Sequence, residues 1–482
     1  MQAKANIQSE TAKMYRPAVH FTPEHSWTND PNGMILIDGQ YHLFYQNNPY
    51  AAVWGPMYWG HAVSRDLLHW HHLPTAIEPD KLGVAFSGCC VLDRNNVSGL
   101  GTKEKPALIA IYTSHNLENH TESQSLSYST DYVHFAGYAG NPVIKNPGIP
   151  NFRDPKIFYS PDGDGFCLVV SAHDRVLFYH SRNLTDWEET GAFLMGRHGL
   201  SGIAECPDCF PLKLRNGGEE ITKWILIVSM ITNPDTPEAG HQTQYFIGDF
   251  DGRTFTDTEN AAGPLLLNYG MDYYAAVSFM DTEKRLLLGW ADNWTYANKT
   301  PERDYRGQMS LAAEAELLRT ARGLRLALTP AGTAESEKAA VSFTGHTKPE
   351  TQSFGLKIHG KGDIRIRIGN NGAAADVFNG DMQPDPPEEF VLAVTDGRIR
   401  ADRTKAGRSD FEEHFLLPEN SIAEVQRYTD GAYDIRLYFD KSLVEIFAED
   451  GLIPITMSVY PRHPYTDITV DGDAACSIFT LE

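Results

Sequence analysis

The chain has 482 residues and a mass of 53.8 kDa, which is too long for one ordinary hydrophobic core, so we expect two domains. Its formal net charge of -22 excludes nucleic acid and an anionic membrane surface as standing partners, and it favours a neutral substrate. Aromatic residues make up 11 % of the chain, and 40 Gly with 28 Pro supply many turns, so the composition favours an all-β architecture.

The first residues, Met1 to Glu10, contain no apolar core of the kind that a signal peptide requires. No run along the chain approaches the ~18 consecutive apolar residues of a membrane-spanning helix. As written, the sequence therefore predicts a cytoplasmic protein with no membrane partner. A leader removed from the N-terminus would instead make the protein secreted.

Six cysteines are present, and Cys206 and Cys209 form a C-x-x-C motif typical of zinc or redox sites. No second pair and no nearby pair of histidines completes such a ligand set. We therefore expect buried free thiols behind Glu205, and neither a metal nor a cofactor.

The first informative motif is WTNDPNG at residues 27–33, in which Asp30 precedes a proline and a short apolar run. Proline fixes its own φ and restricts Asp30 to extended conformations, while the Asn-Gly pair that follows is typical of a tight turn. The motif predicts a carboxylate held where a loop tightens into a strand. A polar turn that leads into a hairpin explains the same residues without any function.

Two more carboxylates occupy similarly constrained positions. Asp154 lies in FRDPK at residues 152–156, and Glu205 lies in ECPDCF at residues 205–210. Three acids at strand ends marked by proline, on separate segments, predict a shared pocket.

A repeat of the form S-x-[DN]-[LY]-x-x-aromatic recurs at residues 64–70, 129–135 and 181–187, each time after a strand-like segment. Repeats of this order with several strands per unit are typical of a β-propeller. Dividing residues 15–328 by such a unit predicts about five blades. Asp30, Asp154 and Glu205 would then lie in blades one, three and four, where innermost strands from distant parts of the sequence meet at the axis.

Beyond the repeats, Met309–Leu318 has a helical composition, and 317–328 alternates as a hairpin does. Residues 329–340 are the best candidate for a linker. Alternating segments such as 364–368 and 433–439 predict that residues 341–482 form an antiparallel β-sandwich. We expect this sandwich to pack on the propeller through an apolar surface without reaching the pocket.

In this order and spacing, WTNDPNG, FRDPK and ECPDCF resemble the motifs of the glycoside hydrolases that include invertases, levanases, exo-inulinases and sucrose-6-phosphate hydrolases. The resemblance continues through Trp59-Gly60-His61, Phe86-Ser87-Gly88, residues 270–275 and residues 442–447, and so covers nearly the whole chain. It implies a five-bladed β-propeller with a C-terminal β-sandwich, retaining hydrolysis of β-fructofuranosides, a carbohydrate partner and no metal.

The resemblance implies that Asp30 is the nucleophile, Glu205 the acid/base and Asp154 the transition-state stabiliser. A retaining glycosidase needs the first two about 5 Å apart. The substrate-binding residues that it implies are Asn29, Gln46, Trp54, Phe86, Ser87, Arg153, Asp272, Tyr274 and Trp294. Without these motifs, each of the aromatic residues would be more typical of a core.

Two stretches depart from the family pattern on the leaving-group side: Pro56-Met57-Tyr58 after Trp54-Gly55, and Cys89-Cys90 after Phe86-Ser87-Gly88. With no basic cluster near these motifs, they favour a fructan such as levan or inulin, and sucrose, over sucrose-6-phosphate. A fructosyltransferase of the same fold is the alternative function. A lectin with a dead site is disfavoured because all three acids are present, and nothing in the sequence specifies the oligomeric state.

Overall fold

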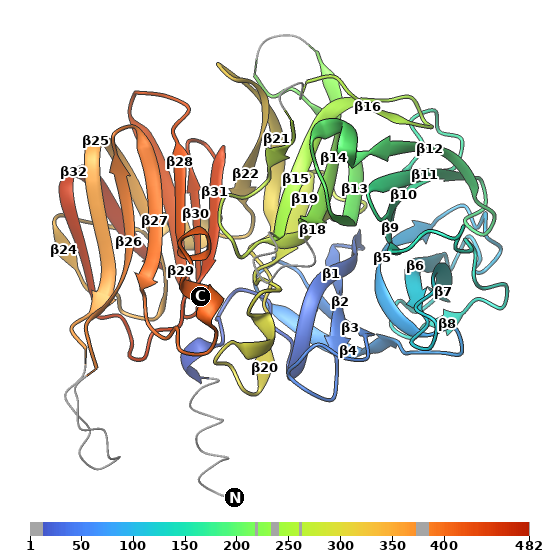
Figure 1. Ribbon diagram of the computed structural model, residues 1–482, viewed down its shortest axis with the longest axis horizontal. Helices are drawn as coiled ribbons and strands as arrows, with labels where there is room; N and C mark the ends of the chain where they lie inside the picture. The colour runs from blue at the N-terminus through green and yellow to red at the C-terminus, as the bar shows by residue number, and fades with distance from the viewer. Residues whose placement is uncertain (1–12, 217–219, 233–240, 260–262, 373–384, 482) are drawn as a thin grey trace, which may run out of the picture.

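The structure, a computed structural model, describes residues 13–216, 220–232, 241–259, 263–372 and 385–481. A wheel of five small sheets forms the N-terminal part, and a larger layered sheet stands beside it (Figure 1). This is the five-bladed propeller and C-terminal sandwich that the sequence predicts. Among the described residues, no helix has both the length and the apolar composition needed to cross a membrane.

Each blade is an antiparallel sheet built from consecutive strands. Blade one contains β1 (Ser26–Ile37), β2 (Gln40–Asn48), β3 (Tyr58–Ser64) and β4 (Trp70–Ile77), with β20 (Tyr305–Arg306) parallel to β1. Blade two contains β5 (Val84–Asp93), β6 (Ala107–His115), β7 (Glu122–Ser129) and β8 (Ala136–Gly137). Blade three contains β9 (Phe152–Tyr159), β10 (Phe166–Ala172), β11 (Arg175–Ser181) and β12 (Glu188–Leu194).

Blades four and five complete the wheel. Blade four contains β13 (Ile203–Lys213), β14 (Thr222–Ile231), β15 (His241–Phe250), β16 (Phe255–Asp257) and β17 (Leu265–Leu266). Blade five contains β18 (Tyr274–Ser278), β19 (Leu286–Trp290), β21 (Ala313–Thr320) and β22 (Gly323–Pro330). The first strand of each blade contacts the first strands of both neighbouring blades, so β1, β5, β9, β13 and β18 form a ring around the axis.

The sequence repeat corresponds to the turn between the third and fourth strands of blades one to three. In each turn a serine hydroxyl donates to the Asp or Asn two residues later, as Ser64 does to Asp66 at 3.0 Å. The aromatic residue that ends the repeat packs behind the turn, where Trp70 Nε1 donates to the Leu67 carbonyl at 3.1 Å. Local side-chain bonding of this kind explains why the pattern is visible in the sequence.

The helix predicted over Met309–Leu318 is wrong. From Ala313 the chain is strand β21, which pairs with β19 on one side and β22 on the other. Ala313, Ala315 and Leu317 are buried, whereas the glutamates between them are less so, which gives a period of two. The two neighbouring strands and this alternation outweigh the helical propensity of Ala, Glu and Leu.

The sandwich has two layers joined by two long strands that pass from one layer to the other, β25 (Ser353–Asn370) and β32 (Asp467–Thr480). Its remaining strands are β23 (Val341–Phe343), β24 (His346–Thr347), β26 (Glu388–Thr395), β27 (Arg398–Lys405), β28 (Ile422–Gln426), β29 (Tyr433–Asp440), β30 (Leu443–Ala448) and β31 (Ile453–Ser458). Short helices in the described part of the chain include η1 (Met195–His198), η2 (Ala297–Lys299), α2 (Ala334–Lys338), η3 (Glu413–Leu416) and α3 (Pro418–Ser421).

The two domains share an apolar interface, as expected. Leu317 and Leu326 of blade five lie in one buried cluster with Tyr438, Phe447 and Phe479 of the sandwich. The expectation that the sandwich stays away from the pocket is wrong, because the loop between β27 and β28 lines the pocket at the propeller axis. Domain packing therefore shapes the candidate site as well as stabilising the fold.

Candidate active site

The five strands around the axis share an irregularity that positions the site. In each of them, two residues face one residue of the next strand, which is a β-bulge. The bulged pairs are Asn29–Asp30, Phe86–Ser87, Asp154–Pro155, Cys206–Pro207 and Ala275–Ala276. Bulges re-aim side chains, and all five of these pairs contain or adjoin a residue of the predicted site.

Asp30 lies inside β1 at its bulge, so the tight turn predicted around it is a distorted strand instead. Its Oδ2 accepts a hydrogen bond from Ser87 Oγ at 2.6 Å, and its Oδ1 accepts one from Asn29 Nδ2 at 3.0 Å. Burial raises the pKa of Asp30, and the nearby Glu205 acts in the same direction, while the bonds from Ser87 and Asn29 favour the ionised form. The donors come from two blades and hold the carboxylate in one orientation.

Gly33 allows β1 to pack closely against the side chains of Phe44 and Cys90. It has a φ of 53°, and a Cβ there would lie 2.6 Å from the ring of Phe44 and 2.8 Å from Cys90 Sγ. A larger residue would push β1, and Asp30 with it, away from the pocket floor.

Asp154 lies beside Asp30 and has a φ of 65°, which is rare for a residue with a side chain. Its Oδ2 accepts a hydrogen bond from the backbone N–H of Cys206 at 3.0 Å, and its own N–H donates to Thr113 Oγ1 at 2.9 Å. Burial raises the pKa of Asp154 to about 8; Arg153 opposes this change, and the acids Glu205 and Asp30 add to it. Backbone strain and a raised pKa at a buried carboxyl are typical of functional groups.

Cys206 is a hydrogen-bond donor in this arrangement. Burial raises the pKa of its thiol well above the usual range, and Asp154 and Asp30 add to that effect. Its one S–H is shared between Asp30 Oδ2, which lies 3.4 Å from Sγ, and Asp154 Oδ2, which lies 3.6 Å from Sγ. The thiol therefore stays protonated and bridges the two acids.

Glu205, on β13, is the third acid of the pocket. Its Oε1 accepts hydrogen bonds from Arg153 Nη2 at 2.9 Å and Nε at 3.2 Å, and its Oε2 accepts one from the Tyr274 hydroxyl at 2.6 Å. Burial raises the pKa of Tyr274, and the Glu205 carboxylate adds to it, so the phenol stays a donor. Glu205 is thus held from two sides by residues of blades three and five.

Arg153 is itself held by a residue that sequence reasoning missed. Glu122, on β7, accepts a hydrogen bond from Arg153 Nη1 at 3.1 Å and pairs with His115 Nδ1 at 3.2 Å. Burial opposes ionisation of Glu122, but the bonds from His115 and Arg153 outweigh it and lower its pKa. The ring of His115 in turn stacks on Phe86, with 4.5 Å between centroids. No motif marks Glu122, so only its place in the fold identifies it.

The three acids line one pocket of about 1160 Å³. The other predicted residues that line it are Asn29, Gln46, Trp54, Phe86, Ser87, Arg153 and Trp294. Lining residues that the sequence did not indicate include His115, Leu117, His120, Glu122, His241, Lys299, Glu412 and His414. Trp294 stacks on Trp27, whose Nε1 donates to Asn29 Oδ1 at 2.7 Å.

The structure does not bring Asp272 into this pocket. It is fully buried at the domain interface, where its carboxylate accepts hydrogen bonds from the Tyr296 hydroxyl, from Arg403 Nη1, and from the Ser458 N–H at 2.7 Å. Tyr274 is 1 % exposed and reaches the site through Glu205. The motif that contains both residues therefore supports the site from behind.

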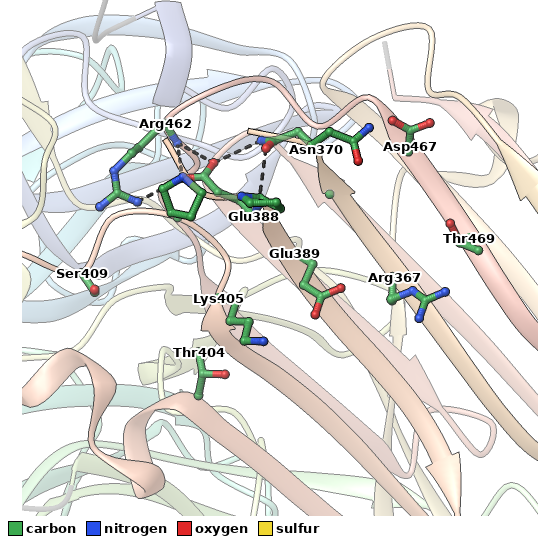
Figure 2. A pocket seen from close by; sticks show the side chains of 15 residues that line it. Arg367, Asn370, Glu388, Glu389, Thr404, Lys405, Ser409, Arg462, Asp467 and Thr469 are labelled. Carbon is green, nitrogen blue, oxygen red and sulfur yellow. Dashed lines mark hydrogen bonds and ion pairs between the residues drawn. The ribbon is translucent and has the colours of Figure 1, made fainter. Parts of the chain in front are cut away.

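A second hollow, of about 680 Å³, lies on the sandwich (Figure 2). Its buried acid, Glu388, is held by Arg462 Nη1 at 3.1 Å and by Asn370 Nδ2 at 3.1 Å. No aromatic side chain lines this hollow among the described residues. We therefore place the candidate active site at the propeller axis, where paired acids and aromatic residues meet.

Two groups of side chains have ligand atoms close enough to hold a cation, within 4.8 Å of one another. They are Asp30 with Asp154 and Cys206, and Glu412 with Glu413 and His414. In the first group the protonated thiol already joins the two carboxylates. The expectation of a site without metal or cofactor stays a prediction.

Comparison with known proteins identifies the family. The pattern described as the glycosyl hydrolases family 32 N-terminal domain matches residues 20–330, and the one for the family 32 C-terminal domain matches residues 306–477. The chain belongs to glycosyl hydrolase family 32. The resemblance stated from three short motifs is therefore confirmed.

Other members of family 32 match along most of this chain. The levanase of Bacillus subtilis is 38 % identical over 93 % of this chain and 66 % of its own length. The levanase of Bacillus sp. strain L7 is 32 % identical over 93 % of this chain and 49 % of its own length. The chain thus spans about two thirds of one curated levanase and about half of the other.

Solved structures agree on the fold. The exo-inulinase of Aspergillus awamori superposes with a TM-score of 0.84 at 28 % identity, covering 97 % of this chain and 98 % of that one. The fructofuranosidase of Schwanniomyces occidentalis, solved with fructose, also has a TM-score of 0.84, at 26 % identity, covering 98 % of this chain and 99 % of that one.

Proposed function

We propose that this family 32 chain is a retaining glycosidase that releases fructose from β-D-fructofuranosides, both fructans such as levan or inulin and sucrose. The observation that carries the proposal is the convergence of Asp30, Asp154 and Glu205, from blades one, three and four, in one pocket with aromatic walls. The names of the relatives, levanase and exo-inulinase, support the same substrate class.

In the first step, an Asp30 oxygen attacks the anomeric carbon of the fructosyl unit while the bond from that carbon to the leaving oxygen breaks. Glu205 gives its proton to the leaving oxygen. Ser87 and Asn29 already hold Asp30 in one orientation, so little reorganisation is needed at the moment of attack.

In the second step, water attacks the same carbon, Glu205 takes a proton from that water, and the bond to Asp30 breaks. Two displacements at one carbon retain its configuration. Asp154 lies against Asp30 and is the acid placed to hold fructose hydroxyls. In its ionised form it also stabilises the positive charge that develops on the sugar. Arg153 orients Glu205 throughout.

Product chromatography after incubation with sucrose, inulin, levan and raffinose tests the proposal. We expect free fructose from several of them, with the remainder of each substrate shortened by one fructosyl unit at a time. No fructose from any of the four would overturn the proposal. Excess glucose over fructose at high sucrose, with longer oligosaccharides, would instead identify a fructosyltransferase.

Sucrose-6-phosphate is a less favoured substrate because the pocket offers little unpaired positive charge. The cations among its described lining residues are Arg153, which binds Glu122 and Glu205, and Lys299, which binds Glu412. A phosphate would have to compete with these carboxylates. Faster hydrolysis of sucrose-6-phosphate than of sucrose would contradict this reasoning.

A further inference from the structure

The pocket at the propeller axis has a wall that comes from the other domain. Glu412 and His414 lie in the loop between β27 and β28 of the sandwich, yet they line the same pocket as Asp30 and Glu205. They meet the propeller at Lys299, on η2, whose Nζ donates to Glu412 Oε2.

We propose that Lys299, Glu412 and His414 form a subsite for sugar units of a fructan chain beyond the scissile bond, and that this subsite makes the enzyme prefer polymeric substrates to sucrose. The inference rests on the proposed function, since it concerns the same pocket. It gives the sandwich a direct part in substrate choice.

The wall is rigid because the loop that carries it is anchored in an aromatic cluster. Phe415, next to His414, is 2 % exposed and packs edge-on against Tyr296 with 5.0 Å between ring centroids. The Arg403 guanidinium lies 4.0 Å from the Phe415 ring centroid and donates to the Tyr296 hydroxyl at 2.7 Å. Tyr296 belongs to the same propeller segment as Trp294 and Lys299, so both sides of the wall are fixed to one another before any ligand binds.

The chemistry of the wall suits sugar hydroxyls. The Glu412 side chain is 5 % exposed, and His414 Nδ1 lies 2.7 Å from its Oε1. Burial opposes ionisation of Glu412, but the bonds from Lys299 and His414 outweigh it and lower its pKa. The Lys299 side chain is 62 % exposed, so its remaining N–H groups can donate to a ligand while Glu412 holds its position. No described residue bonds His414 Nε2, which leaves it for a hydroxyl.

Apolar side chains also line the mouth of the pocket. Trp54 is 46 % exposed and Leu117 is 58 % exposed, and both line the pocket. The Trp54 backbone N–H donates to Asn298 Oδ1 at 2.8 Å, which ties the backbone at Trp54 to the segment that carries Lys299. Apolar side chains beside hydrogen-bonding groups match a sugar ring, which has an apolar face and an edge of hydroxyls.

The size of the pocket agrees with a longer ligand. Its volume of about 1160 Å³ exceeds the range of about 300–1,000 Å³ that is typical of sites for drug-sized ligands. The acids at its floor are buried, and exposure increases towards Trp54, Leu117 and Lys299. Lys299, the most exposed member of the wall, therefore lies towards the mouth, where a chain would continue outward from the fructosyl unit held over Asp30.

The test compares Lys299→Met and His414→Ala with the matched control Glu419→Gln. Glu419 is exposed in the same loop and does not line the pocket. We expect the ratio of kcat/KM for levan or inulin to kcat/KM for sucrose to fall about tenfold in each wall variant, the effect of roughly 1.4 kcal/mol of lost binding, and to stay unchanged in the control. Equal losses on polymer and sucrose would overturn the inference.

A binding experiment keeps the inference separate from the proposed function. Calorimetry with Asp30→Asn measures Kd for a fructan tetrasaccharide and for fructose, with and without His414→Ala in the same chain. We expect weaker tetrasaccharide binding and unchanged fructose binding in the double variant. No difference would refute the subsite, and absence of hydrolysis by the unmodified protein would refute the function alone. Urea midpoints confirm that each variant is folded.

Discussion

Asp272→Asn is the substitution that best separates a structural role from a substrate-binding role. The Asp272 carboxylate and the Arg403 guanidinium are both fully buried, and the carboxylate also accepts a hydrogen bond from the Ser458 N–H at 2.7 Å. Asparagine keeps the shape of the side chain but leaves the arginine charge buried without a counterion. Breaking a buried ion pair from one side typically costs about 3–5 kcal/mol.

Since whole domains are typically stable by only about 5–15 kcal/mol, this loss should appear as a large fall in the urea midpoint at neutral pH. Activity should fall only moderately, through displacement of the segment that Tyr296 anchors. The double variant Asp272→Asn with Arg403→Met is the matched control. Because it removes both charges, we expect it to be less destabilised than Asp272→Asn alone.

The two roles give opposite results. If Asp272 binds fructose directly, as the motif predicts, then Asp272→Asn should raise KM or lower kcat strongly with little change in the urea midpoint. That outcome would refute the reasoning from burial.

Three further predictions concern titratable groups. Glu205→Ala should lose about 10² to 10⁴ in kcat on sucrose and less on an activated aryl fructoside, and equal losses would count against Glu205 as the acid. Burial raises the pKa of Asp154 to about 8, against about 3.9 in an unfolded chain. Because the unfolded chain releases this proton more easily, the free energy of unfolding falls as the pH rises between these two values. Asp154→Asn should therefore have a higher urea midpoint at pH ~7 but no activity, and an unchanged midpoint would contradict this. Burial opposes the charge of His20, but its bonds to Asp440 and Glu445 raise its pKa to about 9. The stability that His20 supplies is complete below pH ~6.5 and is lost as the pH rises through about 9. His20→Gln should therefore reduce the dependence of the urea midpoint on pH in this range. An unaltered pH profile would refute this prediction.

The propeller could be predicted because its turns bond locally. The serine at the start of each repeat donates to an Asp or Asn two residues later, so the pattern needs no tertiary contact to appear in the sequence. The three acids could be predicted because prolines and motif order mark them. The helix that the composition of Met309–Leu318 predicts does not form, because the strand β21 depends on the strands paired with it.

The remaining parts of the site depend on contacts between segments far apart in the chain. Glu122 belongs to the site because it binds Arg153 of the next blade, and Glu412 lines the pocket from the other domain. The motif predicts that Asp272 binds substrate, but its carboxylate pairs with Arg403, which lies 131 positions further along the chain. Neither spacing nor residue type in the sequence reveals such pairings.

The central claim is that Asp30 attacks the anomeric carbon while Glu205 protonates the leaving oxygen. The anomeric form of the first product tests this claim most directly. Hydrolysis of sucrose or inulin is followed by NMR at early times, before the released fructose mutarotates. A covalent intermediate on Asp30 predicts that β-fructofuranose appears first. Asp30→Asn should give no product while still binding fructose. First appearance of the α-anomer would contradict the nucleophilic role of Asp30.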